Sequence, residues 1–561
     1  MHFARRIATP IVVLLLSLHG MSPLQAAAPP AAMQGVRDLA QAGALQLALQ
    51  RIDMLQPADP ADPRRAEWED LRLQLLDRLD RHEEILRRTA ALQATGPATA
   101  RAGVHAVAAR AAIALEQPAL AREHAGRALW SPGISPAAMR DLRLLVIRSL
   151  VMASRAGEAW RSMLRFEQDY RPLDAATAAV FVDALLDAGM AQEAVTWLPL
   201  LDERGPTRLR LHMHAGLVAN GEVLAQVRAA LARSDDQAWW RLLLEAATRG
   251  GDGALRIAAL EQLLEKNAQP KVAAELWSAY ASHARAAANA HHLLAGDDAG
   301  WLEFASGRHA SNAPEARAYL AHVARHAADP VLRQRAQDRL AADYVAAKLP
   351  RAALSLFDAW PGQADQLPAP ARMILGRMAG DIGDHPRALR YLQGLPAADA
   401  MPAAVWQLRL SALALRAGNA TAAADIAQRL AAESSAIPGA QIAEWRLLAE
   451  QLADHGMHEA ALALFGRVLP HAGPAQSRSL LSGIARAHAG RNQPQLAADF
   501  YLRAALQAPA DGAAAAEARL QAGLSLARAG LHEDARAQFQ WLLKNAADPA
   551  QIAVARRELG F

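Results

Sequence analysis

One pattern of small and large apolar residues recurs about every 36 residues in the C-terminal part of the chain. Alanines anchor the pattern and lie 35, 35, 38, 36 and 38 residues apart, at Ala353, Ala388, Ala423, Ala461, Ala497 and Ala535. In the stretch LAADFYLRAALQAPAD, Tyr501 and Ala504 follow Ala497 at offsets of 4 and 7. These offsets place the three residues on one helical face, where the alanines let a neighbouring helix approach and the ring fills the gap. The pattern therefore predicts a series of closely packed helices.

Each of these helices has a companion helix before it in the chain. Leu340, Ala341 and Tyr344 precede the first anchor at helical spacing, and Trp445 and Leu448 precede a later one. Glycines commonly mark the turn between the two helices, at Gly383, Gly418, Gly456, Gly490 and Gly530. Aromatic residues make up only 5% of the chain, whereas alanine, the best helix former, is abundant. The chain is therefore predicted to be all-α.

This pattern of tryptophan, leucine–glycine, tyrosine, alanine and phenylalanine positions resembles the tetratricopeptide (TPR) repeat. The resemblance is specific from about Gln334 to the C-terminus. It implies an α-solenoid, a superhelix of TPR-like helical hairpins whose first helices line a concave groove. The groove-facing positions that the resemblance implies include Arg335, Asp338, Arg377, Arg446, Glu450, Arg486 and Arg528. Each of these charges has an alternative interpretation as an ordinary solvated surface group.

The repeat pattern weakens toward the N-terminus. Residues 28–204 keep the second-helix spacing, as at Ala121 and Ala125, and are expected to form degenerate TPR-like repeats. Residues 205–330 depart most, with two adjacent tryptophans and a glycine-rich loop, and are expected to form irregular helical repeats. Residues 331–561 are expected to form the C-terminal TPR array.

Residues 1–27 have the pattern of a secretory signal peptide. Arg5 and Arg6 precede an apolar stretch over residues 7–18, and small residues follow up to Ala28. Cleavage is expected near Ala28, with the mature chain in the periplasm; an uncleaved membrane anchor is the alternative. The chain has no cysteine, which excludes disulfides and lipid attachment through cysteine. No later segment is apolar enough to predict a membrane span.

No motif predicts catalysis or a cofactor. His322 and His326 have the spacing of two metal ligands but lack a matching carboxylate and cysteine set. Glu433-Ser434 is similar to the catalytic pair of periplasmic lytic transglycosylases, but the glycine-rich segment that should follow is missing. Gly251-Asp252-Gly253 lacks the third glycine and the preceding strand of a dinucleotide site, so it is expected to be a loop. We therefore expect no enzyme activity, no cofactor and no bound metal.

Charge and tryptophan placement narrow the classes of ligand. The net charge of +4 is too small to predict a nucleic-acid partner. Tryptophan side chains can stack on sugar rings. Most of the seven candidate tryptophans lie at core spacing inside predicted helices and are therefore expected to pack in the core. They are Trp68, Trp130, Trp197, Trp277, Trp301, Trp406 and Trp445.

Two functions from different classes fit these expectations. The first is a non-catalytic periplasmic scaffold that binds partner proteins of a cell-envelope assembly or secretion machine through the concave groove. The second is a glycan-handling module, because the TPR portions of exopolysaccharide export systems are similar to this chain. Those exporters usually continue into an outer-membrane barrel, so this alternative implies a separate porin partner.

Overall fold

The computed structural model describes residues 31–560 except 60–61, 95–100, 292–295, 310–312, 361–365, 398–400, 434–436, 438, 509 and 511. The predicted signal peptide, residues 1–27, lies outside the described residues, as does Pro509. The chain divides into two compact units, Met1–Val218 and Ala219–Phe561.

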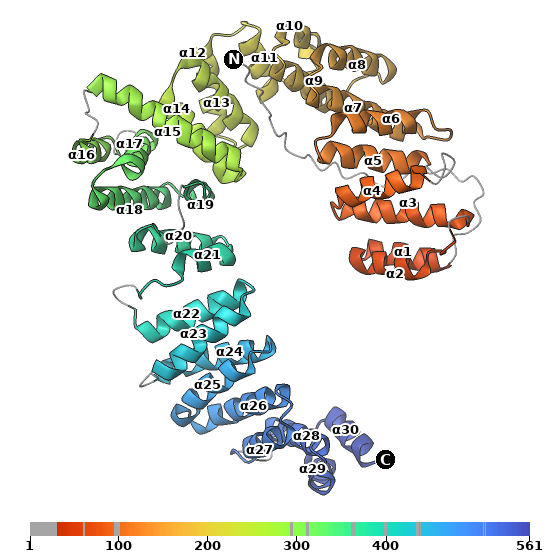
Figure 1. Cartoon of the computed structure of the whole chain (residues 1–561), viewed down its shortest axis with the longest axis vertical. Coiled ribbons are helices and arrows are strands. Elements are labelled where there is room, and N and C mark those ends of the chain that lie inside the picture. The colour runs from red at the N-terminus through yellow and green to blue at the C-terminus, as the bar shows by residue number, and fades with distance from the viewer. Residues whose placement is uncertain are drawn as a thin grey trace. The chain divides into compact units, whose positions relative to one another are not determined.

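The first unit is helical throughout its described residues (Figure 1). Its helices are α1 (Ala31–Gln41), α2 (Leu45–Leu55), α3 (Pro63–Arg78), α4 (His82–Ala94), α5 (Ala102–Ala114), α6 (Pro118–Leu129), α7 (Pro136–Met152), α8 (Ala156–Asp169), α9 (Ala175–Asp187), α10 (Ala191–Ala194), the 3-10 helix η2 (Val195–Leu200) and α11 (Pro206–His214). Consecutive helices pair into hairpins, and each hairpin packs against the next.

The second unit is likewise all-helical over its described residues. It contains α12 (Asn220–Leu231), α13 (Gln237–Gly250), α14 (Gly253–Lys266), α15 (Pro270–His291), α16 (Asp298–His309), α17 (Ala313–His326), α18 (Pro330–Ala346), α19 (Pro350–Asp358), α20 (Ala369–Asp381), α21 (His385–Leu392), α22 (Ala403–Arg416), α23 (Ala420–Glu433), η4 (Gly439–Gln441), α24 (Ile442–Asp454), α25 (His458–Val468), η5 (Leu469–His471), α26 (Pro474–Gly490), α27 (Pro494–Ala505), α28 (Ala513–Arg528), α29 (His532–Asn545) and α30 (Pro549–Leu559). The chain is therefore an all-α helical-repeat protein, as the sequence predicts.

The anchor alanines are buried in the second helices of the hairpins. All six are in second helices of hairpins, α19 to α29 in odd-numbered order, and none is more than 3% exposed. First helices carry glycine opposite two large second-helix side chains. A Cβ added at Gly376 would lie 2.4 Å from Leu392, and one added at Gly523 would lie 2.7 Å from Phe539. Small residues on one helix and large ones on its partner thus set the spacing within a hairpin.

A residue with positive φ makes the turn inside the hairpins. Glycine holds this position as predicted at Gly383, Gly418, Gly456 and Gly530, with φ between 75° and 81°. The same prediction is wrong for Gly490, because Asn492 makes that turn with φ of 58°. Gly490 instead ends α26 at a close approach, where an added Cβ would lie 2.3 Å from the His458 ring. Lys348 and Glu116 take the positive φ in two other hairpins.

Arginines near the starts of first helices bind the C-terminal ends of second helices. Arg372 of α20 donates to the carbonyl oxygens of Tyr391 and Gln393, at 3.0 and 2.6 Å. Arg478 of α26 donates in the same way to carbonyls at the end of α27, and Arg65 of α3 to those that follow α2. The last carbonyls of a helix lack intrahelical partners and carry partial negative charge. These arginines therefore fasten neighbouring helix ends.

The region predicted to be irregular contains a bundle of a different design. The 22-residue helix α15 is the longest of the described helices there, and α14 packs against α13, α15, α17 and α19. This bundle contains a buried salt bridge: Arg317 of α17 donates to both carboxylate oxygens of Glu261 of α14, at 2.8 and 2.5 Å. The two residues are 3% and 1% exposed. The Tyr280 hydroxyl donates to Glu261 at 2.6 Å and lies 2.6 Å from the Tyr344 hydroxyl.

Candidate partner-binding face

The seven predicted groove residues lie on the first helices of five hairpins in the second unit. Arg335 and Asp338 are on α18, Arg377 on α20, and the remainder on the next first helices: Arg446 and Glu450 on α24, Arg486 on α26 and Arg528 on α28. Helix α18 packs against α20, and α24 packs against α26, so these faces adjoin in pairs. We call the solvent-exposed side of these helices, which carries Arg335, Arg377, Arg486 and Arg528, the first-helix face.

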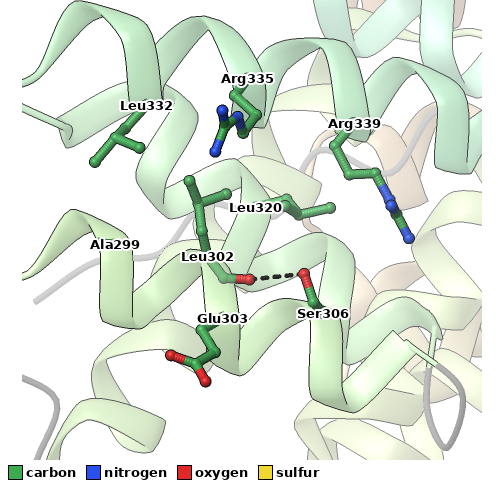
Figure 2. A pocket seen from close by; sticks show the side chains of 8 residues that line it. All are labelled: Ala299, Leu302, Glu303, Ser306, Leu320, Leu332, Arg335 and Arg339. Carbon is green, nitrogen blue, oxygen red and sulfur yellow. Dashed lines mark hydrogen bonds between the residues drawn. The ribbon is translucent and has the colours of Figure 1, made fainter.

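A cleft of about 320 Å³ opens on this face between α16 and α18 (Figure 2). Leu302, Leu320 and Leu332 form an apolar surface, and Figure 2 shows Arg335 and Arg339 on the α18 side with Glu303 on the α16 side. Arg339 is bound to Asp343 at 3.1 Å, whereas Arg335 forms no ion pair or hydrogen bond with any described residue. The cleft thus combines an apolar floor with a free guanidinium.

Asp338 is engaged by the fold itself. Its carboxylate accepts a hydrogen bond from the backbone N–H of Ala371 in the first turn of α20, at 2.9 Å. Burial raises the pKa of Asp338, and the hydrogen bond from Ala371 opposes that rise only in part. Because an N-terminal N–H has no partner within its own helix, Asp338 links one hairpin to the next.

Arg446 and Glu450 are largely committed to each other. Their side chains form an ion pair of 2.6 Å one turn apart on α24, and Arg446 also donates to the Ser479 hydroxyl of α26 at 3.3 Å. These contacts hold two adjacent first helices together. They leave both charges less available to a partner than Arg377, which is exposed and pairs with no described residue.

Arg486 and Arg528 lie on the first helices before and after α27, which carries Tyr501. Burial raises the pKa of the Tyr501 hydroxyl, and the charges of Arg486 and Arg528 oppose that rise. Arg486 also lies 3.9 Å from Asp454, a pair in which both side chains are more than half exposed. Exposed pairs of this kind contribute little to stability. The ion pair with Asp454 therefore leaves Arg486 accessible to a partner.

Sequence reasoning missed the residues that α16 and α17 add to the cleft. Those helices belong to the stretch 205–330, where the sequence shows no regular repeat register. The structure gives them the downstream register: Trp301 lies four residues before buried Ala305, as Trp445 lies four residues before buried Ala449. Ala316, the fourth residue of α17, is fully buried and holds the place of an anchor alanine, and the buried Arg317 follows it directly.

Several charged residues on the first helices of the first unit are paired with each other. Charged pairs bridge its successive first helices: Asp77 with Arg110 at 2.7 Å, Arg140 with Asp174 at 2.8 Å, and Arg210 with Asp183 at 3.0 Å and with Asp187 at 2.6 Å. Arg148 of α7 is not paired in this way: it is exposed, and its side chain forms no ion pair with a described residue. The free arginines Arg335 and Arg377 have no such partner among the described residues. Unpaired first-helix arginines therefore occur in both units, and Arg335 of the second unit lines the cleft.

The described residues that were candidates for catalysis or metal binding take part in side-chain packing, helix ends and turns. His322 packs on Trp301 with ring centroids 4.5 Å apart, and its ring centroid is 5.0 Å from that of His326. Over the described ranges no cluster of three or more histidine, aspartate or glutamate residues could hold a metal ion. Glu433 ends α23, and Ser434 lies outside the described residues. Asp252 caps α14 by accepting from the Leu255 N–H, so Gly251–Gly253 is a helix-connecting turn as expected.

All but one of the tryptophans named in the sequence analysis are buried. Six of the seven named above are at most 7% exposed and pack as expected, whereas Trp130 is 92% exposed after the end of α6. In the part of the chain that the structure describes, no helix has the length and apolar character needed to cross a membrane.

No family model matches the chain, and no curated protein matches it. Two solved structures align over most of its length. A chain of the APC/C hetero-tetramer Cut9–Hcn1 is 13% identical, with 86% of this chain and 94% of that chain covered and a TM-score of 0.27. A chain of Naa15/Naa10 bound to HypK-THB is 14% identical, with 94% and 86% covered and a TM-score of 0.25. Because both TM-scores are low, the helical-repeat assignment rests on the hairpins described above.

Proposed function

We propose that the chain is a non-catalytic helical-repeat scaffold that binds a partner protein of a cell-envelope assembly or secretion machine. The binding surface is the first-helix face of the second unit. The observation that carries the proposal is the pair of exposed, unpaired arginines, Arg335 and Arg377, on two first helices that pack together.

The chemistry of the cleft narrows the partner segment. An apolar side chain would cover Leu302, Leu320 and Leu332, while a carboxylate beside it would pair with Arg335. A second carboxylate along the same segment would reach Arg377 on the next helix. Each exposed ion pair is weak alone, but several aligned pairs add up and favour one partner over others. An acidic protein segment with an interspersed apolar residue fits these features.

A charge-reversal experiment tests this surface. Wild-type chain and the double variant Arg335→Glu/Arg377→Glu are used as bait in envelope extract at low and moderate salt. The matched control is Arg351→Glu/Arg429→Glu, which changes the same charge at exposed positions on the second helices α19 and α23. We expect the first variant to lose the partners that wild type and control both retain, and added salt to weaken the wild-type complex. Equal recovery by all three proteins would refute the surface.

Export to the periplasm belongs to the same proposal. It rests on the basic start, the apolar stretch and the small residues within positions 1–28. N-terminal sequencing of the protein from cell fractions tests it: a mature chain starting near Ala28 in the periplasmic fraction is expected. A chain that retains residue 1 and sediments with membranes would contradict it.

One observation favours the alternative of a glycan-handling module, namely the exposed Trp130. A solvent-exposed indole is a suitable platform for a sugar ring. This alternative, which implies a separate outer-membrane porin, predicts that Trp130→Ala weakens polysaccharide binding with little dependence on salt. The arginine reversals should then have no effect.

A further inference from the structure

Two histidines lie buried against each other in the alanine-rich core of the α5–α6 hairpin. His105 of α5 and His124 of α6 are 5% and 4% exposed, and their Nδ1 atoms are 3.1 Å apart. His105 lies four residues before buried Ala109, the place that Trp445 holds in its own hairpin. The pair therefore fills a core position of the repeat with two groups that titrate near neutral pH.

The hydrogen bond between the rings depends on their protonation. In the neutral pair one imidazole donates its Nδ1–H and the other accepts on its Nδ1 lone pair, so the acceptor carries its proton on Nε2. A first added proton can go to Nε2 of the donor ring, which leaves this hydrogen bond in place. A second must go to Nδ1 of the acceptor ring. Two N–H groups and two positive charges would then face each other across 3.1 Å.

The surroundings do not compensate for such charge. Burial lowers the pKa of both histidines, and each also feels Arg127, while Glu123 opposes the shift. Glu123 and Arg127 lie on α6 and pair with each other at 2.7 Å. Several charged residues on the surrounding helices are engaged elsewhere. These are Glu84 with Arg88 on α4, Arg101 with Asp70 and Arg110 with Asp77 between the α5 and α3 regions, Arg122 of α6 with the Ser149 carbonyl, and Arg140 with Asp174 and Arg143 with Asp169 from α7.

Two charged residues of α7 and the segment before α5 also belong to the surroundings of the pair. Asp141 and Arg148 of α7 are exposed, and neither shifts the pKa of the two imidazoles. Residues 95–100, which precede α5, contain no titratable side chain. The only charged groups found to act on the pair are thus Glu123 and Arg127, among the residues that the structure describes.

We propose that His105 and His124 form an acid-sensitive joint, which holds α5 against α6 at neutral pH and releases it on double protonation. The unfolded segment takes up protons on both histidines below their ordinary pKa of about 6.5, whereas the packed pair resists them. Stability is therefore kept above about pH 6.5 and lost as the pH falls below it. Because each hairpin in a repeat array is held by its neighbours, opening of this one also frees the faces of α4 and α7 that pack on it.

Hydrogen exchange on the full chain tests the joint. Protection factors, corrected for the intrinsic effect of pH, are compared at pH 7.5 and 5.0 for peptides from α5–α6, with peptides from α28–α29 as an internal reference. In wild type we expect α5–α6 to lose protection at least about tenfold, the change that one proton taken up on opening produces over one pH unit. The reference helices should not follow.

Two variants separate the joint from general acid sensitivity. In His105→Asn/His124→Asn the two amides can hydrogen-bond at any pH, so protection should be equal at both pH values whatever its starting level. His532→Asn, at an exposed histidine that begins α29, should behave like wild type. If the double variant does not fold, His124→Asn alone must show a smaller pH dependence, since one titrating ring remains. Equal acid losses in wild type and the Asn variants, or undiminished wild-type protection at pH 5.0, would overturn the proposal.

Discussion

Asp338, which the repeat pattern places in the groove, instead accepts a hydrogen bond from the next hairpin. Its position on a first helix follows from helical periodicity, but its hydrogen bond to the Ala371 N–H depends on where the next helix begins. The same holds for Arg446, whose partner Ser479 lies on another hairpin. Local spacing thus predicts the face that a residue occupies. It cannot predict which charges on that face remain free, because that depends on the ends of neighbouring helices.

Asp70 of α3 gives a prediction at this scale. Burial raises the pKa of Asp70 to about 6, the nearby Glu67 and Glu69 add to the rise, and Arg101 opposes it. Its Oδ1 atom is buried and accepts no hydrogen bond within the described structure. The folded state therefore favours protonated Asp70, and this stabilisation is lost as the pH rises from about 4 through 6. Asp70→Asn should increase the free energy of unfolding by about 1 kcal/mol at pH 7.5, because the loss of the Arg101 attraction offsets part of the gain.

The comparison with wild type at each pH isolates this effect from other acid transitions. Thermal unfolding followed by circular dichroism should show the gain at pH 7.5 and none at pH 4. Asp77→Asn is the matched control, because Asp77 is paired with Arg110 at 2.7 Å and its loss should not stabilise at any pH. A variant at position 70 that is less stable than wild type at pH 7.5 would show that Arg101 dominates.

At the scale of helices, the anchor alanines allow neighbouring helices to pack closely. Enlarging Ala497 measures how much this close packing contributes to the free energy of unfolding. Ala497 is fully buried in α27, where a longer side chain would force the neighbouring helices apart. Ala497→Leu should cost about 1 to 3 kcal/mol through overpacking, whereas Arg503→Leu, at an exposed position one and a half turns later, should cost less than about 0.5 kcal/mol. Urea unfolding of both variants measures the difference. Similar losses would mean that α27 does not pack through its alanine face.

The sequence predicts these helices well because anchors, companions and turns repeat. It fails at Arg317, a charged residue buried directly after the small residue Ala316, since no local pattern indicates that Glu261 lies opposite. Burial lowers the pKa of Arg317, but hydrogen bonds and the charge of Glu261 outweigh it and raise the value overall. Arg317 therefore stays charged inside the bundle of α14, α15, α17 and α18.

A double-mutant cycle measures what this buried pair contributes. Arg317→Met should destabilise by about 3 to 5 kcal/mol, because it leaves the Glu261 carboxylate buried with only the Tyr280 hydroxyl as a donor. Adding Glu261→Leu should recover most of that loss, since removal of both charges leaves none uncompensated. The hydroxyls of Tyr280 and Tyr344 can still bond to each other in the double variant. A double variant no more stable than Arg317→Met would assign the loss to packing rather than to charge.

At the scale of the whole molecule, the repeat pattern predicts an all-α array but not where it divides. The predicted segments end at residues 204 and 330, whereas the compact units meet between Val218 and Ala219. A boundary of this kind depends on which helix faces are covered, and the sequence around 205–330 shows no regular register from which to infer it. The largest core cluster among the described residues lies wholly in the second unit, from Ile257 to Ile484, and four smaller ones lie wholly in the first.

This division predicts that residues 219–561 fold alone. Cutting at 219 leaves the largest core cluster intact, so the fragment should be helical and unfold cooperatively. Cutting at 350 instead divides that cluster and removes α14 and α15, against which α19 packs. Residues 350–561 should then show hydrogen-exchange protection in α26–α29 but little in α19, whose Leu354 and Leu356 are fully buried in the intact chain. Circular dichroism and hydrogen exchange on the two fragments distinguish these outcomes, and a largely unfolded 219–561 would show that the second unit needs the first.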